Sequence, residues 1–345
     1  MTRAIRHYAT FDDRPVRNAV GLKLLMLSVA EHAPDDVLHV VLPDVPEALA
    51  DWIRRHAPQV QVHRWRPQGE GWSAKPEVLL YLMDQGIDEV IWLDADLMLI
   101  RNPRPLWEEV PDEVLMVAED LARRYDAALG DEKARVWGYE KKRDLATGLN
   151  SAVLRMTRQH RPLIESWRSH LQDERYLQAQ RNYTGFVDRP RALYGDQEVL
   201  DALLITCFAE IPIRFIRYGP EIIHDHRHFY AYTARDRLRN AFRLTRPYFV
   251  HCTGFHPWLV GPSFHEDEGG EYFHESVQLK PYVWYARRYA DKLEEDNLDF
   301  WLHYRTPFGR LCQVLTLNNP HLQGLGLWLL DRYRRRRKRR WAHAH

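Results

Sequence analysis

Two carboxylates separated by one residue follow a short apolar run in the first third of the chain. The segment from Glu89 to Leu93 has the composition of a buried strand, and Asp94 and Asp96 come directly after it. Alternation along an extended segment would point both carboxylates to the same side. Two carboxylates this close repel each other, and a divalent cation such as Mn²⁺ or Mg²⁺ relieves the repulsion by taking oxygen ligands. The pattern therefore predicts a metal site, although an isolated pair of this kind is usually a solvated acidic turn.

The elements around this pair alternate between strand and helix. Strand patterns cover residues 4–9, 37–42, 60–65 and 89–93, and helix patterns cover residues 19–32, 46–56 and 75–85. Alternation of this kind predicts a largely parallel sheet with helices on its faces. Ligands of such sheets bind at the carboxyl ends of the strands. The acidic pair at 94–96 lies at such an end.

The second half of the chain is less regular. Strand patterns cover residues 114–117, 152–156 and 247–252, an amphipathic helix covers 195–206, and a charged, helical insertion is expected over 122–143. Beyond Trp258 the sequence is aromatic and charged without a clear period. We therefore expect an α/β protein with a Rossmann-like mixed sheet flanked by helices, followed by a helical C-terminal extension.

Three more motifs accompany the acidic pair. They are L-N-S-A-V-L at 149–154, D-Q-E-V-L at 196–200 and H-C-T-G-F-H-P-W at 251–258. In order, over residues 4 to 258, they resemble the motifs of GT-A glycosyltransferases, most like the family 8 group of retaining lipopolysaccharide galactosyl- and glucosyltransferases and glycogenin-like enzymes. Two positions depart from that family: Ala152 stands where glycine is usual, and His256 stands where the family has a phosphate-binding lysine in a segment one residue longer.

The resemblance implies a role for each matching residue. Asp94, Asp96 and His251 would hold Mn²⁺ or Mg²⁺, while Asp196 and Gln197 would act at the reacting sugar. His256, or a basic residue from elsewhere, would neutralise the donor diphosphate. The residues expected to bind the nucleotide-sugar donor are Tyr8, Ala9, Thr10, Asp13, Lys75, Asp94, Asp96, Asp120, Asn150, Ser151, Gly254 and His256.

The function implied by this resemblance is metal-dependent transfer of a hexose from a nucleotide-diphosphate donor, a UDP-sugar, to a glycan or lipid-linked acceptor with retention. Residues 1–260 would form the transferase domain, residues 261–331 an acceptor-side extension and residues 332–345 a basic tail. Two alternatives stay open. A sugar nucleotidyltransferase would carry a glycine-rich, lysine-bearing loop near its N-terminus, which this sequence lacks, and a non-catalytic nucleotide-sugar-binding protein would have lost its metal ligands.

Charge is distributed unevenly along the chain. The formal net charge is only +1, yet eight of the nine residues from Arg332 to Arg340 are Lys or Arg. The apolar residues of 325–330 followed by this basic run predict peripheral attachment to an anionic membrane surface, with a solvated tail as the alternative and nucleic acid disfavoured. Three scattered cysteines and the absence of a long apolar segment predict a cytoplasmic protein, on the inner face of the membrane where it is attached.

Histidines and a lysine outside the acidic pair allow more than one interpretation. His224, Asp225 and His226 alternate like metal ligands, but Arg227 among them favours a polar surface strand or loop. His251 alone would read as an ordinary histidine at the end of a strand. Lys75 opens a helix, where a lysine is commonly solvated, so its predicted donor contact depends on the resemblance.

Overall fold

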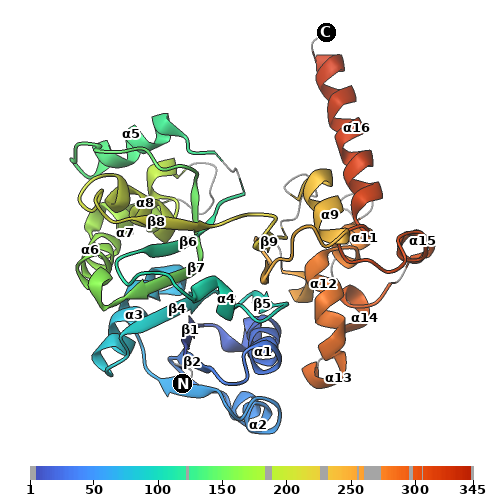
Figure 1. The fold of residues 1–345 in the computed structure, drawn as a ribbon, viewed down its shortest axis with the longest axis horizontal. Helices are drawn as coiled ribbons and strands as arrows, with labels where there is room; N and C mark the ends of the chain where they lie inside the picture. The colour runs from blue at the N-terminus through green and yellow to red at the C-terminus, as the bar shows by residue number, and fades with distance from the viewer. Residues whose placement is uncertain are drawn as a thin grey trace. The chain divides into compact units, whose positions relative to one another are not determined.

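The protein divides into two compact units that interleave along the chain. Its structure, a computed structural model, describes residues 5–121, 124–182, 189–225, 232–254, 256–259, 273–294, 298–304 and 306–342. Unit 1 comprises Met1–Ala19, Ala33–Ala95 and Arg104–Arg217, and unit 2 comprises Val20–His32, Asp96–Pro103 and Tyr218–His345 (Figure 1). The boundaries expected at 260/261 and 331/332 stay predictions, and residues 260 and 261 lie outside the described part of the chain.

Unit 1 is built on a seven-stranded mixed sheet with the strand order β3-β2-β1-β4-β7-β6-β8. The strands are β1 (His7–Phe11), β2 (Val37–Leu42), β3 (Gln61–Arg64), β4 (Glu89–Leu93), β6 (Leu115–Glu119), β7 (Leu149–Thr157) and β8 (Ile213–Ile216). Strands β3, β2, β1 and β4 are parallel, while β7 runs antiparallel to both of its neighbours. The predicted α/β class with a mixed sheet is therefore confirmed.

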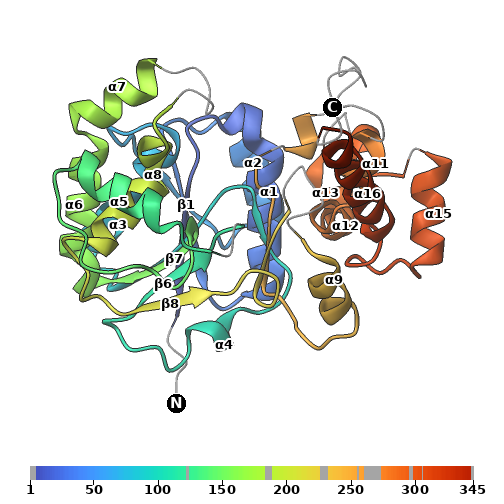
Figure 2. The same cartoon turned by 90° about the horizontal axis from the view of Figure 1, so that it is seen from above.

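Helices cover the sheet of unit 1 because its strands are apolar on the faces that they present. Val90 and Trp92 of β4, together with Leu154 of β7, belong to one buried cluster that includes Trp167. Figure 2 shows α3, α5, α6, α7 and α8 on one side of this sheet. The helices of unit 1 are α2 (Glu47–His56), α3 (Lys75–Asp84), α4 (Arg104–Trp107), α5 (Ala127–Val136), α6 (Arg161–Leu171), α7 (Glu174–Asn182) and α8 (Asp196–Ile205), with 3-10 turns at Gly71–Ala74, Arg158–His160 and Arg191–Leu193.

Unit 2 holds a small three-stranded sheet and short helices. The sheet has the order β5-β10-β9, and its strands are β5 (Leu97–Leu99), β9 (Ile222–His224) and β10 (Phe249–His251). Helix α1 (Pro15–His32) starts in unit 1 and continues into unit 2. The remaining helices are α9 (Ala234–Ala241), α11 (Phe273–Gln278), α12 (Pro281–Ala286), α13 (Ala290–Leu293), α14 (Leu298–Trp301), α15 (Pro307–Leu315) and α16 (Leu325–Ala342), with 3-10 turns at Pro257–Leu259 and Arg287–Tyr289.

Three element predictions need correction at their ends. The first strand begins at His7 rather than residue 4 and continues to Phe11, and the strand expected over 152–156 spans Leu149–Thr157. All nine residues of β7 are buried, so no alternation marks its ends. The helical insertion shrinks to Ala127–Val136, while residues 122 and 123 lie outside the described part.

Two apolar residues of the segment at 325–330, which was predicted to attach to a membrane, are buried inside unit 2. Leu327 and Trp328 are buried, and Leu327 packs in a cluster with Leu279 and Cys312. Leu329 is 55% exposed. These residues and the basic run after them form one helix, α16. Within the described residues, no helix is both long and apolar enough to cross a membrane.

Candidate active site

A buried lysine joins two of the predicted site residues in unit 1. Lys75 opens α3, where it is 3% exposed, and its Nζ lies 3.0 Å from Asp94 Oδ1 and 3.3 Å from Asp196 Oδ2. It also donates to Ser151 Oγ at 2.8 Å, and that hydroxyl in turn donates to Asp196 Oδ2 at 2.8 Å. The interpretation of Lys75 as a solvated lysine is therefore wrong. We call Lys75, Asp94, Ser151 and Asp196 the carboxylate cluster.

The electrostatics of this cluster follow from its burial. Burial alone would lower the pKa of Lys75, but the two carboxylates overcome it and raise that pKa. Burial raises the pKa of Asp196, against the opposing effect of Lys75. Trp92 Nε1 donates to Asp94 Oδ1 at 2.7 Å, so this carboxylate accepts two charged or polar donors. One ammonium thus balances two carboxylates, and the cluster has a formal charge of −1 when both are ionised.

Helix α8 presents three polar residues in its first turn. Asp196 starts the helix, where a carboxylate is favoured by the helix dipole, and its carbonyl accepts from Trp167 Nε1 at 2.9 Å. Gln197 is half-buried and its Nε2 donates to Glu198 Oε1 at 3.1 Å. Burial raises the pKa of Glu198 to about 7. Sequence reasoning assigned no role to Glu198, although its place in the D-Q-E motif was the available signal.

The residues expected to bind the nucleotide lie within β1 and in the loop that follows it. Tyr8 and Ala9 are fully buried, and their backbones pair with β2 on one side and β4 on the other. Thr10 is also fully buried, and its Oγ1 has no hydrogen-bond partner among the described residues. Asp13 Oδ2 accepts from the backbone N–H of Gly71 at 2.6 Å, which ties the loop after β1 to the turn before α3. Buried hydroxyls normally have a hydrogen-bond partner, so the Thr10 hydroxyl is one candidate for a contact with a ligand.

The antiparallel strands contribute two more predicted residues. Asn150 lies near the start of β7 and is 8% exposed, and its Oδ1 accepts from the backbone N–H of Ala152 at 3.0 Å. Asp120 follows β6, and its backbone N–H donates to the carbonyl of Gly148 at 2.8 Å. The register between β6 and β7 shifts after Val117, so these two segments pair differently near Asp120 than along the rest of β6.

Unit 2 holds the second half of the predicted metal set. Asp96 precedes β5 and lies between two imidazoles: His251 Nε2 is 3.3 Å from its Oδ1, and His256 Nε2 is 2.9 Å from its Oδ2. Strand β5 pairs antiparallel with β10, which aligns Leu97 with His251. Burial alone would raise the pKa of the Asp96 carboxyl, but His251 and His256 hold it well below its usual range. The side chains of Asp96, His224, His251 and His256 are called the histidine cluster below.

His224 corrects one prediction made from the sequence. The H-D-H segment was expected on a polar surface, but His224 is fully buried and Asp225 is 6% exposed. His224 Nδ1 lies 2.9 Å from His251 Nδ1, and Thr253 Oγ1 lies 3.1 Å from the same nitrogen. Contacts of this kind orient the ring of a histidine that uses its other nitrogen as a ligand. His226 and His228 lie outside the described residues.

The segment after β10 holds the remaining predicted residues. Gly254 has a φ of +83°, a backbone conformation that glycine adopts without strain. The ring of His256 stacks on Trp258, with ring centroids 4.7 Å apart and an interplanar angle of 7°. The residue that replaces the family's lysine is thus held on one side by an indole and on the other by Asp96.

The prediction that Asp94 and Asp96 lie along one extended segment is wrong. Strand β4 ends at Leu93 and β5 begins at Leu97, so Asp94 and Asp96 lie in a turn between two strands rather than along an extended segment. The backbone N–H of Asp94 donates to the carbonyl of Ala152 within unit 1, and the carbonyl of Asp96 accepts from Cys252 within unit 2. The backbone of Asp94 is therefore bonded to unit 1 and the backbone of Asp96 to unit 2.

Comparison with known proteins gives matches only among solved structures. No protein-family model and no curated protein matches the chain. The chain is similar to the galactosyltransferase LgtC in complex with donor and acceptor sugar analogues, with a TM-score of 0.46, 16% identity and coverage of 83% of this chain and 95% of that one.

Two further solved structures show a comparable likeness. GlyE, a glycosyltransferase of Streptococcus pneumoniae, has a TM-score of 0.47 and 16% identity over 84% of this chain and 64% of that one. Mouse xyloside xylosyltransferase 1, in its apo form, has a TM-score of 0.43 and 16% identity over 73% of this chain and 98% of that one. All three are glycosyltransferases, the class of enzyme that the motifs of this chain resemble.

Proposed function

We propose that this protein is a metal-dependent glycosyltransferase that moves a sugar from a UDP-sugar to a glycan or lipid-linked acceptor with retention. The observation that carries the proposal is the environment of the acidic turn: Asp94 belongs to the carboxylate cluster and Asp96 to the histidine cluster. Only Ala95 separates these residues, so the chain itself keeps their Cα atoms within about 7 Å of each other.

The donor set fits a divalent cation. Asp94, Asp96 and His251 would supply two carboxylates and one imidazole, a set that suits Mn²⁺ and, with water or phosphate oxygens, Mg²⁺. The side chains of His224 and Thr253 contact Nδ1 of His251. The other ring nitrogen, Nε2, faces Asp96 and would be available to bind the metal. When bound, the ion would stabilise the negative charge that grows on the leaving diphosphate.

The residues of this chain would divide the remaining work. Thr10 Oγ1 and the backbone at the end of β1 would bind the nucleoside, and His256, fixed against Trp258, would face the diphosphate in place of the family's lysine. Asp196 would accept hydrogen bonds from sugar hydroxyls while Lys75 and Ser151 hold it in place. Gln197 would lie at the anomeric carbon, as the family resemblance implies for a retaining enzyme.

Ligand binding and turnover test the proposal together. Thermal unfolding is measured with each nucleoside diphosphate and its sugar, with and without Mn²⁺, because a ligand of the folded state raises the melting temperature by mass action. We expect UDP and a UDP-sugar to stabilise the protein only with Mn²⁺. Release of UDP should fall by about a thousandfold in Asp96→Asn, since loss of one electrostatic contact of this kind costs about 4 kcal/mol.

Asp299→Asn is a matched control, because this carboxylate is in the same unit and its side chain is 88% exposed. It should leave both readouts unchanged. Stabilisation by UDP without any turnover would favour a non-catalytic nucleotide-sugar-binding protein. Undiminished turnover in Asp96→Asn would refute the proposed metal site, and an inverted anomer in the product would refute retention.

A further inference from the structure

Three large apolar side chains stand exposed within seven residues of unit 2. Leu238 on α9 is 41% exposed, Phe242 at its C-terminal end is 70% exposed, and Leu244 in the following turn is 71% exposed. Most leucines of this protein are buried, so two exposed leucines and an exposed phenylalanine so close together form a local apolar patch. We call these three residues the α9 patch.

Backbone hydrogen bonds to α9 fix the conformation of the turn that contains Phe242 and Leu244. The backbone N–H of Phe242 donates to the carbonyl of Leu238 at 2.9 Å, and that of Leu244 donates to the carbonyl of Arg239 at 2.8 Å. Arg243, between the two exposed residues, has a φ of +58°, and Thr245 Oγ1 bonds to Asn240 Oδ1. The backbone thus fixes Phe242 and Leu244 where they stand.

Arginines surround the patch, and the acidic residue near it is turned inward. The segment from Arg235 to Arg246 contains five arginines and one aspartate. Arg235, Arg243 and Arg246 are exposed, whereas Asp236 is 7% exposed and bonds to Thr233. The exposed charge of this surface is therefore positive.

Helix α16 adds positive charge beside α9. The two helices pack against each other within unit 2, and both views of the fold draw them side by side (Figures 1 and 2). Arg332, Arg334 and Arg336 on α16 are exposed. Unit 2 therefore carries exposed arginines on two helices that contact each other.

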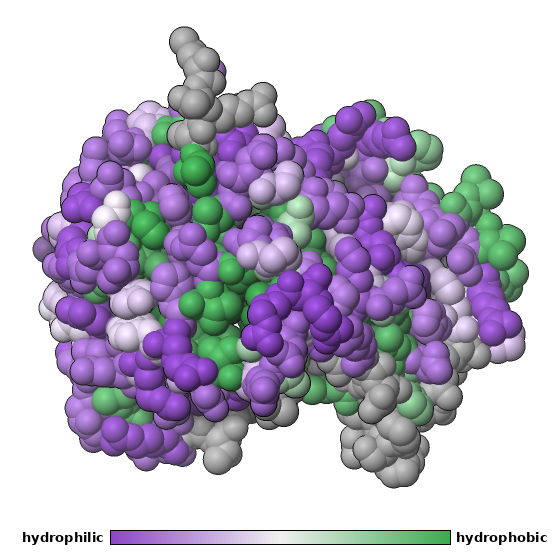
Figure 3. Space-filling model, turned by 90° about the horizontal axis from the view of Figure 1, so that it is seen from below, coloured by the Kyte–Doolittle hydropathy of each residue, from purple (hydrophilic) through white to green (hydrophobic). Residues whose placement is uncertain are grey.

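A second exposed apolar surface of unit 2 lacks this charge. Figure 3 shows apolar surface at its right-hand edge, on the side where Figure 1 draws α15. On α15 and its C-terminal turn, Val314, Leu315 and Leu317 are 69%, 72% and 92% exposed, yet Arg310 is the one basic residue from Pro307 to Asn318. Apolar exposure alone is therefore common in this unit. On α9, as on α16 with its exposed Leu329 and Tyr333, it occurs beside exposed arginines.

The α9 patch points to a bilayer rather than to a folded partner. We propose that it docks on an anionic phospholipid surface, with Phe242 and Leu244 in the boundary between headgroups and acyl chains and with Arg235, Arg243 and Arg246 at the phosphates. Apolar side chains that project from a rigid turn can sink into such a boundary, and arginines beside them add attraction to anionic lipid. This site differs from the 325–330 segment, whose Leu327 and Trp328 are buried in unit 2.

Vesicle flotation with the full chain tests this inference, using phosphatidylcholine vesicles with and without phosphatidylglycerol. We expect binding only to vesicles that contain phosphatidylglycerol. The variant Phe242→Ser/Leu244→Ser should weaken this binding by at least about tenfold, the effect of withdrawing one large apolar side chain from burial. The variant Arg243→Gln/Arg246→Gln should weaken it roughly fivefold for each arginine and reduce its sensitivity to salt.

The matched control is Leu315→Ser/Leu317→Ser, which removes two residues that are more exposed than those of the α9 patch. It should leave flotation unchanged, and the melting temperature should be the same for all three variants. Equal loss in this control would show unspecific adsorption and overturn the proposal. So would binding to heparin as tight as to the vesicles and indifferent to Phe242→Ser/Leu244→Ser, or a concentration-dependent dimer in solution that this variant abolishes.

Discussion

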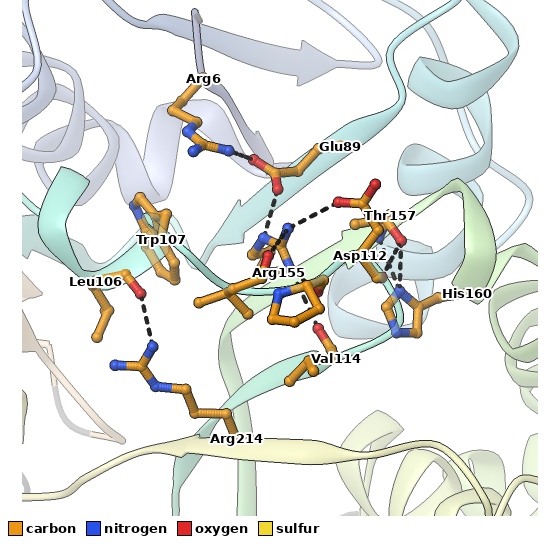
Figure 4. Close-up of polar contacts among 12 residues, drawn as sticks. Arg6, Glu89, Leu106, Trp107, Asp112, Val114, Arg155, Thr157, His160 and Arg214 are labelled. Atoms are coloured by element: carbon orange, nitrogen blue, oxygen red, sulfur yellow. Dashed lines mark hydrogen bonds and ion pairs between the residues drawn. The ribbon is translucent and has the colours of Figure 1, made fainter.

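The two ends of strand β4 each carry a buried cation between carboxylates, but the two arrangements differ in how the cation is satisfied. Glu89 begins β4 and accepts from Arg155 and Arg6, each at 2.5 Å (Figure 4). Asp94 follows the other end of β4 and contacts Lys75. Arg155 is 1% exposed and Lys75 is 3% exposed. The two arrangements therefore do not differ in how far solvent reaches the cation.

The Arg155 end is neutral. The Arg155 guanidinium donates to the carbonyls of Val110, Pro111 and Val114 as well as to Glu89, and Asp112 lies 3.4 Å away (Figure 4). Two arginines here face two carboxylates. Since a planar guanidinium has five donors in a fixed geometry, it can satisfy a whole loop of carbonyls at once.

The Lys75 end is not neutral. One ammonium serves Asp94, Asp196 and Ser151, which leaves a formal charge of −1 among these residues. An excess of buried carboxylate is costly for stability. The two ends of the strand therefore differ in net charge: arginines match the carboxylates at the Glu89 end, and carboxylates are in excess at the Asp94 end, where the proposed function would place the cation and the donor.

Substituting Lys75 should have the largest effect. In Lys75→Met the buried pair Asp94 and Asp196 loses its counter-charge, so we expect turnover to fall by about a thousandfold and the free energy of unfolding by about 3–5 kcal/mol. Sugar transfer and urea unfolding measure the two. Lys141→Met, which removes a lysine that bridges Asp131 and Asp144 at the surface, should change neither by much. Wild-type turnover in Lys75→Met would contradict the proposal that the Lys75 end of β4 serves the reaction.

Substituting Arg155 should destabilise the protein without changing its chemistry. Arg155→Met leaves three buried carbonyls without their donor and Glu89 with Arg6 alone, which should cost about 3–5 kcal/mol in the free energy of unfolding. Turnover per folded molecule and the KM for the donor should stay at their wild-type values when both are measured below the unfolding range. A selective loss of turnover would mean that this end of the sheet also serves the reaction.

Glu198→Gln should have the smallest effect, and the size of that effect should depend on pH. Because burial raises the pKa of Glu198 to about 7, the folded state holds a proton that the unfolded state releases above its ordinary pKa of about 4.5. This carboxyl therefore lowers stability as pH rises from about 4.5 to 7. We expect Glu198→Gln to raise the free energy of unfolding by about 3 kcal/mol at pH 8 and to leave it unchanged at pH 4.

Glu89→Gln provides the contrasting measurement at the other end of β4. It should lower the free energy of unfolding at pH 8, because Glu89 is paired with two arginines. A stabilising Glu89→Gln, or a Glu198→Gln whose effect is the same at both pH values, would contradict the assignment of structural and functional ends.

Local sequence determined much of the sheet and the identity of the acidic turn. Strand β4 has the predicted bounds of Glu89 and Leu93, and α8 begins within one residue of its predicted start, because apolar periodicity and a charged boundary are properties of neighbouring residues. The bounds of β7 could not be predicted, because no such boundary in the local pattern marks them. A strand that is buried along its whole length has no alternation to mark where it ends.

Only the tertiary structure decided which side chains meet. Lys75, Ser151 and Asp196 come together from segments about 45 and 76 residues apart, and His224 reaches His251 from a neighbouring strand. Nothing local distinguishes a lysine that opens a helix in solvent from one buried between carboxylates. Those outcomes depend on strand order and on long-range packing, which a single sequence does not encode in any short window, whereas the Asp94 and Asp96 pair was fixed by the chain itself.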